Sequence, residues 1–242
     1  MIDIHCHILP DLDDGASSME EALEMARTAA DSGVTDIIAT PHFRGAPEAL
    51  EMKEEIDRRY RELKAALQRW QIPIKLHKGA EILCTPQTPL LARQGLLPTL
   101  GDTKYVLLEF YFNESFGFMD SCLQKIASMG YTPVVAHPER YDAVQWDPEQ
   151  LWFWESRGYV FQLNKGSVLG TLGFRAEQTA HEMLELGLAH VFASDAHNCD
   201  RRTPNMEGLQ RWMEECCDPE LAQILLKKNP SQIIQGLPIT SL

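Results

Sequence analysis

The chain has 242 residues, of which 44% are hydrophobic and 24% are charged. These values are typical of a soluble globular protein, and we expect one domain that spans residues 1–242. The formal net charge of −13 disfavours general nucleic-acid binding, because that function needs clustered lysine and arginine to neutralise phosphates. An anionic substrate would therefore have to be captured by local cations, such as bound metal ions.

Neither a membrane span nor a secretion signal is expected. No apolar run approaches the roughly 20 residues that a bilayer requires. The N-terminus also lacks the basic and then apolar start of a signal peptide. We therefore expect a cytoplasmic protein without direct membrane insertion. Its six cysteines include no CxxC pair, so reduced thiols are the default for a chain of this size.

The opening stretch MIDIHCHILPDLDDG predicts a strand that carries two histidines one residue apart. Because side chains alternate along a strand, one face is expected to present Asp3, His5 and His7. The opposite face is then expected to consist of Ile2, Ile4, Cys6 and Ile8. This pattern fits both a half-buried strand with a polar face and a metal clamp, so the rest of the chain has to decide.

The following elements alternate between helices and apolar strands. Ser18 and Glu21 predict a capping box at a helix start, and Gly33 predicts its end. Strands are then expected in VTDIIATPH, IKLHKGAEI, YVLLEF, YTPVVAH, YVFQLN and LAHVFASD. With the opening strand these make seven, and their nearly continuous apolar character favours parallel strands buried on both sides. Since no nucleotide-binding glycine motif follows any strand, we favour a distorted (β/α)7 TIM-like barrel over an open doubly wound sheet.

Two further helices are expected to serve structural purposes. Residues 48–70 predict a long charged helix whose arginines alternate with acids, which is typical of a solvated face rather than an anion site. Residues 218–236 predict a helix packed on the barrel, with Leu221, Ile224 and Leu225 turned inward. This helix equally suits contact with a second subunit, so the oligomeric state stays open.

Polar residues follow nearly every predicted strand, and the carboxyl ends of parallel barrel strands share one rim. Asn164 is one of them, and the candidate metal ligands among them are His5, His7, Asp14, His42, Glu81, Glu109, His137, Asp195 and His197. This set exceeds what one four- or six-coordinate ion needs, which predicts two or three divalent metals bridged by carboxylates. Imidazoles and carboxylates without thiolates suit Mn, Fe or Zn, and Mg is also compatible. His77, His181 and His190 fall outside the pattern and are expected to be ordinary surface or core side chains.

Such a rim is suited to hydrolysis, because metals lower the pKa of bound water and polarise the bond under attack. Arg140 lies three residues beyond His137, and Arg201 and Arg202 follow shortly after SDAHN. Guanidinium groups bind phosphate oxygens in a bidentate manner and stabilise charge during phosphoryl transfer. A phosphate ester is therefore the expected substrate class. None of the six cysteines has an arginine six positions on, so a cysteine nucleophile is not expected.

The motifs IDIHCHILP, DDG, TPHF, GAEI, LLEF, AHPER and SDAHN together resemble the PHP (polymerase and histidinol phosphatase) superfamily. More closely, the chain looks like the bacterial PHP-type protein-tyrosine phosphatases of capsule and exopolysaccharide systems. The motifs run from residue 2 to beyond residue 200, and their joint order is specific. The resemblance implies a trinuclear centre, often filled by manganese. It also implies dephosphorylation of the tyrosine-rich tail of a membrane-associated bacterial tyrosine kinase.

The resemblance further implies a division of the ligands among three metals. One metal would take His5, His7, Glu81 and Asp195; a second would take Glu81, Glu109 and His137; a third would take Asp14, His42 and His197. Arg140 and Arg202 would bind the phosphate. In CDRRTPNM, however, a threonine stands directly before the proline, where the family more often has an arginine. Arg201 is therefore the alternative to Arg202. In the mechanism that we expect, His42, Asp14 or a metal-bound water would assist departure of the tyrosine phenolate.

Other functions compete with this hypothesis. A small-molecule phosphomonoesterase, such as a histidinol-phosphate phosphatase, would use the same metals with a different pocket. An amidohydrolase would be expected to carry a bridging lysine at a later strand end, where this chain has Glu109. A regulatory module without catalysis is disfavoured by the full ligand set. An exonuclease-like member is disfavoured by the acidic composition.

Overall fold

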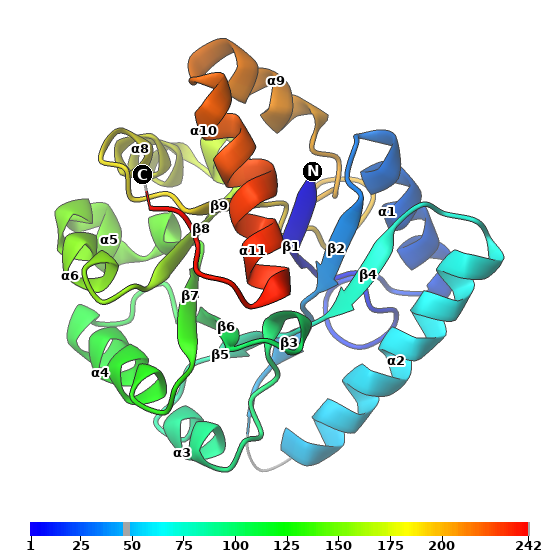
Figure 1. Ribbon diagram of the computed structural model, residues 1–242, viewed down its shortest axis with the longest axis horizontal. Helices are drawn as coiled ribbons and strands as arrows, with labels where there is room; N and C mark the ends of the chain where they lie inside the picture. The colour runs from blue at the N-terminus through cyan, green and yellow to red at the C-terminus, as the bar shows by residue number, and fades with distance from the viewer. Residues whose placement is uncertain (46–48, 242) are drawn as a thin grey trace.

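In the computed structural model, which describes residues 1–45 and 49–241, nine parallel strands alternate with helices. The strands are β1 (Ile2–Cys6), β2 (Asp36–Ala39), β3 (His42–Phe43), β4 (Lys75–Lys78), β5 (Glu81–Leu83), β6 (Tyr105–Glu109), β7 (Thr132–Ala136), β8 (Val160–Asn164) and β9 (Val191–Ala193). The longer helices are α1 (Met19–Asp31), α2 (Ala49–Arg69), α4 (Phe116–Ala127), α8 (Phe174–Glu185) and α9 (Glu207–Cys216). Shorter helical segments are α3 (Thr88–Arg93), η1 (Leu100–Asp102), η2 (Pro138–Arg140), α5 (Asp142–Trp146), η3 (Pro148–Leu151), α6 (Trp152–Glu155), α7 (Lys165–Val168), α10 (Pro219–Gln223), η4 (Ile224–Lys228) and α11 (Asn229–Gln235). Most helices lie around the outside of the strands, while α11 passes in front of them (Figure 1).

The strands form two parallel sheets, with the orders β1-β2-β4 and β3-β5-β6-β7-β8-β9. The sequence predicted seven strands because it counted β2 with β3, and β4 with β5, as single strands. The first pair is interrupted around Pro41, which has no N–H group for a ladder hydrogen bond. The second pair is interrupted at Gly79 and Ala80. The fold is thus α/β with parallel sheets.

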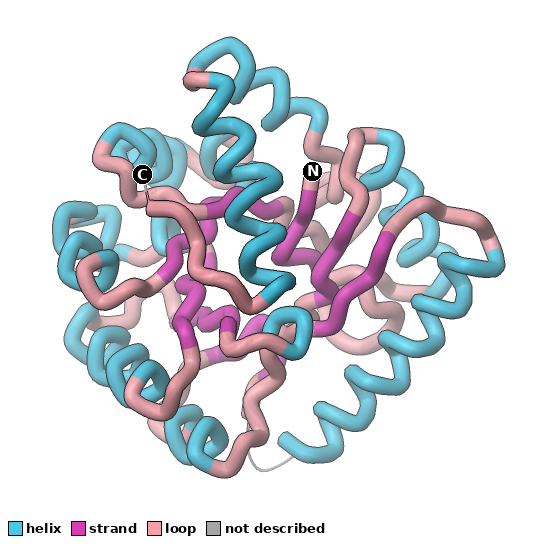
Figure 2. Tube along the Cα trace, viewed as in Figure 1, coloured by secondary structure: helices cyan, strands magenta, loops and turns pink. Residues whose placement is uncertain are grey.

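The first and last strands bring the two sheets together. The backbone N–H of Asp195 donates to the carbonyl oxygen of His5 at 2.8 Å, and that of His7 donates to Ala196 at 2.8 Å. Cys6 and Ala196 form an isolated parallel bridge between these bonds. Figure 2 shows the strands gathered at the centre of the molecule with helices around them. Two segments that are far apart in sequence therefore present their candidate ligands side by side.

Alternate strand residues pack into two apolar clusters. The larger cluster takes residues such as Val106, Leu108 and Val135 together with the buried faces of the helices. The smaller cluster consists of Ile4, Ile38, Leu100, Tyr105, Leu107, Val134, Ala136, Val160, Val191, Ala193 and Ile233. Helix α11 contributes Ile233 to it, so the end of the chain covers the strands at the end where Tyr105 begins β6.

The alternation predicted for the opening strand is wrong in its middle. Ile4 packs in the smaller cluster, whereas Cys6 and Ile8 pack in the larger one. The pairing of β1 with β2 shifts register between Asp3 and Cys6. An irregularity of this kind breaks the two-residue period, so side chains before and after it change faces. As a result, the side chains from Asp3 to Cys6 do not alternate strictly between the two faces of the strand.

Helices α1 and α2 follow the predicted pattern with one difference. Ser18 caps α1 by accepting a hydrogen bond from the N–H of Glu21, but the Glu21 carboxylate reaches Ser17 rather than closing a capping box on Ser18. Helix α2 matches the charged helix predicted for residues 48–70, apart from Glu48, which lies outside the described residues. On its surface Arg58 pairs with Glu55 and Glu62, in agreement with a solvated face.

The predicted C-terminal helix is present but is not continuous. Helix α10, a π-helical turn (η4) and helix α11 follow one another and end at Gly236, which has a left-handed backbone conformation. Leu225 is fully buried, and Leu221 and Ile224 are partly buried against the larger cluster, as predicted. Among the described residues, none of the helices is long and apolar enough to cross a membrane.

Candidate metal centre

All nine predicted ligand side chains gather where the strands end. They are His5, His7, Asp14, His42, Glu81, Glu109, His137, Asp195 and His197. His5 and His7 are fully buried, and Glu81, His137, Asp195 and His197 are nearly so. Since buried polar groups are costly without partners, this concentration requires a compensating arrangement.

Glu81 lies at the centre of this arrangement. One of its oxygens, Oε1, lies 3.2 Å from His5 Nε2 and 2.9 Å from His137 Nε2. The other, Oε2, lies 3.2 Å from His7 Nε2 and 3.1 Å from His42 Nδ1. Burial by itself would raise the pKa of Glu81, but the surrounding imidazoles hold it well below its usual range. One carboxylate thus contacts four histidines, which is the geometry expected of a bridging ligand.

The rings of His5 and His7 are oriented by groups on their far sides. His5 Nδ1 lies 2.8 Å from Gln162 Oε1, and His7 Nδ1 lies 2.7 Å from Asp13 Oδ2. Both far-side atoms accept hydrogen bonds, so each Nδ1 carries a proton, and the neutral form of each ring has its lone pair on Nε2. The two Nε2 atoms face each other at 3.2 Å. Two lone pairs that converge in this way require a cation or a proton near both of them.

A chain of two amides on β8 fixes the orientation of His5. Asp195 accepts hydrogen bonds only, so Asn164 turns its Nδ2 toward Asp195 Oδ2 at 2.6 Å. The Asn164 oxygen then accepts from Gln162 Nε2 at 2.8 Å, which leaves Gln162 Oε1 to face His5. The tautomer of His5 that presents Nε2 to the centre therefore follows from the charge of Asp195.

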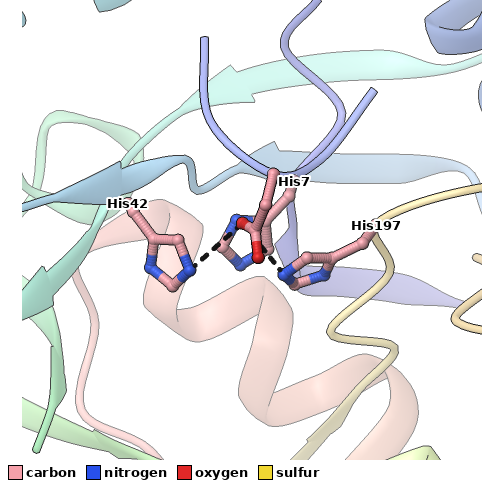
Figure 3. Close-up of side chains that lie close together, drawn as sticks. His7, His42 and His197 are labelled. Carbon is pink, nitrogen blue, oxygen red and sulfur yellow. Dashed lines mark ion pairs between the residues drawn. The ribbon is translucent and has the colours of Figure 1, made fainter. Parts of the chain in front are cut away.

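His42, His197 and Asp14 form the open side of the centre. Figure 3 shows the rings of His42 and His197 on either side of His7. Asp14 Oδ1 lies 3.3 Å from His42 Nε2 and 3.5 Å from His197 Nε2. The Asp14 side chain is 63% exposed, whereas that of His197 is 5% exposed. Burial and the nearby His7 lower the pKa of His197 to about 4, which keeps its ring neutral. Because the Asp14 carboxylate is exposed, a substrate would meet Asp14, His42 and His197 before the rest of the centre.

His137 and Glu109 complete the opposite side. His137 Nε2 lies 3.8 Å from Glu109 Oε1, and Glu109 Oε2 lies 3.6 Å from His42 Nδ1. His137 has φ of 35°, in the left-handed region that an L residue adopts only when its surroundings require it. Burial, together with the charge of Glu81, raises the pKa of Glu109. Ligand oxygens of Glu81 and Glu109 lie within 4.8 Å of each other, and two carboxylates at this separation favour a cation between them.

Asp195 links the centre to two arginines. Arg202 Nη2 lies 2.6 Å from Asp195 Oδ2, and Arg140 Nη1 lies 3.5 Å from the same oxygen. Arg201 is exposed, and within the described residues its guanidinium makes no ion pair closer than 4.0 Å. The loop is fixed because Asn198 Oδ1 accepts the backbone N–H groups of Asp200, Arg201 and Arg202. Of the two alternatives, Arg202 is therefore the one that faces the site.

The protonation of the two opening histidines reflects the surplus of negative charge. Burial alone would lower the pKa of His5, but the charges of Glu81 and Asp195 outweigh it and raise the pKa to about 9. For His7, burial is outweighed by hydrogen bonds with Asp13 and Glu81, which raise the pKa to about 10. The site thus favours positive charge where the imidazoles and carboxylates meet.

The donor atoms satisfy the requirements of a metal centre. Three groups have ligand atoms within 4.8 Å of one another: His7, Asp14, His42 and His197; His5, His7 and Glu81; His42, Glu81 and Glu109. His7, His42 and Glu81 each belong to two of these groups. These groups differ from the predicted division. The prediction assigned His7 to a single metal and His42 to another single metal, whereas each belongs to two groups here. It also paired Glu109 with His137, whereas Glu109 here is grouped with His42 and Glu81. The facing Nε2 atoms and the contacts of Glu81 together show that divalent cations fit these residues.

Two supporting residues were missed by the sequence analysis. Asp13 accepts from His7 and also from the backbone N–H of His42 at 2.8 Å, and Gln162 accepts from His5. Asp13 lies beside the predicted Asp14, and only the loop conformation decides which carboxylate points inward. Gln162 could have been found, because it is a polar residue at an alternate position of an otherwise apolar strand, two residues before Asn164.

The remaining histidines and the cysteines lie elsewhere, as predicted. His77 pairs with Asp36, His181 contacts the carbonyl oxygen of Val168, and His190 accepts from the N–H of Phe161. All six cysteines are free thiols. Burial raises the pKa of Cys6 well above its usual value, so this neighbour of the two opening histidines is not a reactive thiolate.

A cavity of about 300 Å³ adjoins the centre at His42 and Glu109. Its other walls are mainly apolar and aromatic, and they include Tyr111 and Phe112. The Phe112 ring lies 6.1 Å from that of His137 and 4.4 Å below the Arg140 guanidinium. A flat aromatic group could therefore lie in this cavity while its polar end reaches the centre.

Comparison with known proteins agrees with this geometry. The family model described as capsular polysaccharide synthesis, CpsB/CapC, matches residues 1–235. Tyrosine-protein phosphatase YwqE of Bacillus subtilis is 36% identical over 231 residues, which cover 93% of this chain and 88% of YwqE. Tyrosine-protein phosphatase CpsB of Streptococcus pneumoniae is 32% identical over 240 residues, which cover 97% and 98% of the two chains.

The structural comparison covers the whole fold. A crystal structure from the pair YwqE of Bacillus subtilis and CpsB of Streptococcus pneumoniae, described as metal-dependent tyrosine phosphatases, matches with a TM-score of 0.89 at 31% identity. The match covers 100% of this chain and 97% of the other. Both sequence and fold therefore agree over nearly the full length. The chain belongs to the CpsB/CapC family of capsular polysaccharide synthesis proteins.

Proposed function

We propose that this chain is a metal-dependent protein-tyrosine phosphatase that acts in capsule or exopolysaccharide synthesis. The observation that carries the proposal is the gathering of five imidazoles and four carboxylates beside the guanidinium groups of Arg140 and Arg202. The relatives named as tyrosine-protein phosphatases, which align over nearly the whole chain, support the same activity.

The nine converging side chains are the proposed metal ligands, with Glu81 as the central bridge. Two or three divalent ions are proposed, with Mn as the first choice and Fe, Zn or Mg as the alternatives, because imidazole and carboxylate donors without thiolate suit all of these ions. When bound, the metals would lower the pKa of water and polarise the phosphate ester. Asp13 and the pair Gln162 and Asn164 would hold the ligand rings in their binding orientation.

The chain's own residues supply substrate binding and proton transfer. Arg140 and Arg202 each have N–H groups beyond those that face Asp195, and these would bind phosphate oxygens. The tyrosyl ring would lie in the cavity next to His42 and Glu109. His42 is 18% exposed and Asp14 is 63% exposed, so both lie where a proton could pass to the departing oxygen. A phenol with a pKa of about 10 leaves with modest help of this kind.

Three further features belong to the proposal. A closed seven-stranded barrel is supported by the hydrogen bonds that join β1 to the segment after β9. The substrate would be the phosphotyrosine tail of a membrane-associated bacterial tyrosine kinase. The cytoplasmic location expected from the sequence would place the enzyme beside such a tail.

The test compares two phosphate esters before and after metal removal. Protein purified without chelator is assayed for phosphate release from a phosphotyrosine peptide and from histidinol phosphate, then chelated and supplied again with Mn, Zn or Mg. We expect release from the peptide that is lost on chelation and restored by one of the ions. Turnover of histidinol phosphate without turnover of the peptide would instead assign the enzyme to small-molecule metabolism.

A further inference from the structure

A second cavity lies next to the candidate centre, on the far side of Phe112. It encloses about 470 Å³, and its walls include Phe112, Arg140, Gln145, Phe174 and Arg175. Phe112 also lines the cavity at His42 and Glu109. The two cavities therefore share one wall, and a peptide whose phosphotyrosine fills the first can extend into the second.

The charge of this second cavity is opposite to that of the chain. Acidic residues outnumber basic ones 35 to 22 in the sequence. Nevertheless, the cavity is lined by two arginines, and none of its described lining residues carries a carboxylate. Arg175 is exposed, and within the described part of the chain its guanidinium has no ion-pair partner closer than 4.0 Å. A positive charge without a partner in an acidic protein favours an anion from outside.

The aromatic rings of the same cavity are unusually exposed. Phe174 is 69% exposed and Phe112 is 42% exposed. The Arg140 guanidinium stacks on the Phe112 ring at 4.4 Å, which holds both groups at the shared wall. An occupant with an apolar stem or ring and a negative end would contact the phenylalanines and the guanidinium of Arg175 together.

We propose that this cavity, the Arg175 cleft, binds an anionic side chain that flanks the phosphotyrosine in the substrate. The inference rests on the proposed phosphatase function and adds a rule for choosing among phosphotyrosine peptides. Either a carboxylate or a second phosphate can pair with Arg175, because a guanidinium group binds both in a bidentate manner. The chemistry shared by these occupants is an anion close to the scissile phosphate.

The test measures kcat and KM for a set of phosphotyrosine peptides with the metal-loaded protein. Glutamate, phosphotyrosine, alanine or lysine is placed in turn at the three positions on each side of the scissile phosphotyrosine. We expect at least one position at which an anion lowers KM by about fivefold relative to alanine, the range of an exposed ion pair. The preference should shrink as salt is raised, since exposed charges are screened.

Arg175→Ala, Arg175→Lys and Arg211→Ala identify the group responsible. Arg211 is an exposed arginine on α9 that pairs with Glu207 and does not line the cleft, so its variant should keep the full preference. Arg175→Ala should abolish the preference, and Arg175→Lys should restore part of it. Equal KM values for all peptides, or a preference that survives in Arg175→Ala, would overturn the proposal. Failure to hydrolyse any phosphotyrosine peptide would instead reject the proposed function itself.

Discussion

The two ends of the same strands differ sharply in chemistry. On β6, the side chains at alternate positions are Tyr105, Leu107 and Glu109. On β9, the alternate positions are Val191 and Ala193, and the next one, just after the strand, is Asp195. The first members of each series belong to the smaller apolar cluster, whereas the last belong to the candidate centre. Position along a strand, rather than the identity of the strand, therefore decides whether a residue serves stability or chemistry.

Histidines show the same contrast. At the carboxyl ends of the strands, carboxylates outweigh burial and raise the pKa of His5 to about 9 and of His7 to about 10. His190, which precedes β9 at the other end, is buried, and no acidic group among the described residues offsets the burial that lowers its pKa to about 4. His197 is an exception within the centre, because burial and the nearby His7 lower its pKa to about 4. The difference between His190 and the pair His5 and His7 therefore marks where the protein collects negative charge for cations.

The largest effect on the contrast between the two ends is expected from removing the negative charge of Glu81, the proposed bridging ligand. Glu81→Gln keeps the size of the side chain but removes the charge that contacts four histidines. We expect metal content to fall and phosphate release to drop by about 10³-fold, at the upper end of single electrostatic losses at active sites. Metal analysis and peptide hydrolysis measure both effects. The exposed Glu215→Gln serves as control, and normal metal content with normal activity in Glu81→Gln would contradict the bridging role.

The opposite end is tested by acid. The pKa of His190 is about 4 in the folded protein and about 6.5 when unfolded, so its neutral form is favoured by folding. Its contribution is complete above pH 6.5 and is lost as the pH falls toward 4, by about 3 kcal/mol in the free energy of unfolding. Denaturant unfolding across this range should show a shallower pH dependence for His190→Asn, whose amide oxygen can still accept from Phe161. Identical slopes for the two proteins would show that His190 is not buried in its neutral form.

Neighbouring arginines sharpen the boundary of the centre. Arg202 contacts Asp195 at 2.6 Å, while Arg201 faces solvent. Arg202→Ala is expected to reduce kcat/KM for a phosphotyrosine peptide by about 10²-fold, because a charged phosphate contact is lost. Arg201→Ala should change it by less than about twofold, as is usual for surface substitutions. The reverse ranking in steady-state kinetics would move the phosphate contact to Arg201.

The supporting amides are expected to have the smallest effect. Gln162→Leu removes the acceptor that holds His5 Nδ1 and the donor to Asn164. Loss of a group that orients a ligand typically weakens metal affinity by about 10-fold to 100-fold, and we expect the lower part of this range because Asp195 and Glu81 remain. Metal titration measures the change directly, with Thr179→Val, a buried position on α8 outside the ligand groups, as control. Unchanged affinity in Gln162→Leu would show that the strand alone fixes His5.

The sequence predicted the candidate site better than it predicted local strand geometry. The nine ligand candidates are brought together because parallel strands share an edge, so their order along the chain was enough to place them. The irregularity near Ile4 and the interruption at Pro41 were not predicted, since both depend on how neighbouring strands pair. Likewise, the choice between Arg201 and Arg202 depends on a loop held by Asn198, which periodicity does not describe.

The most direct test of the account is anomalous X-ray diffraction from crystals of Mn-loaded protein, recorded on both sides of the manganese absorption edge. We predict two or three anomalous peaks within coordination distance of His7, His42 and Glu81, with Glu81 shared between peaks. Metal peaks located away from these residues in an active protein would contradict the claim that the carboxyl ends of the strands form the catalytic metal centre.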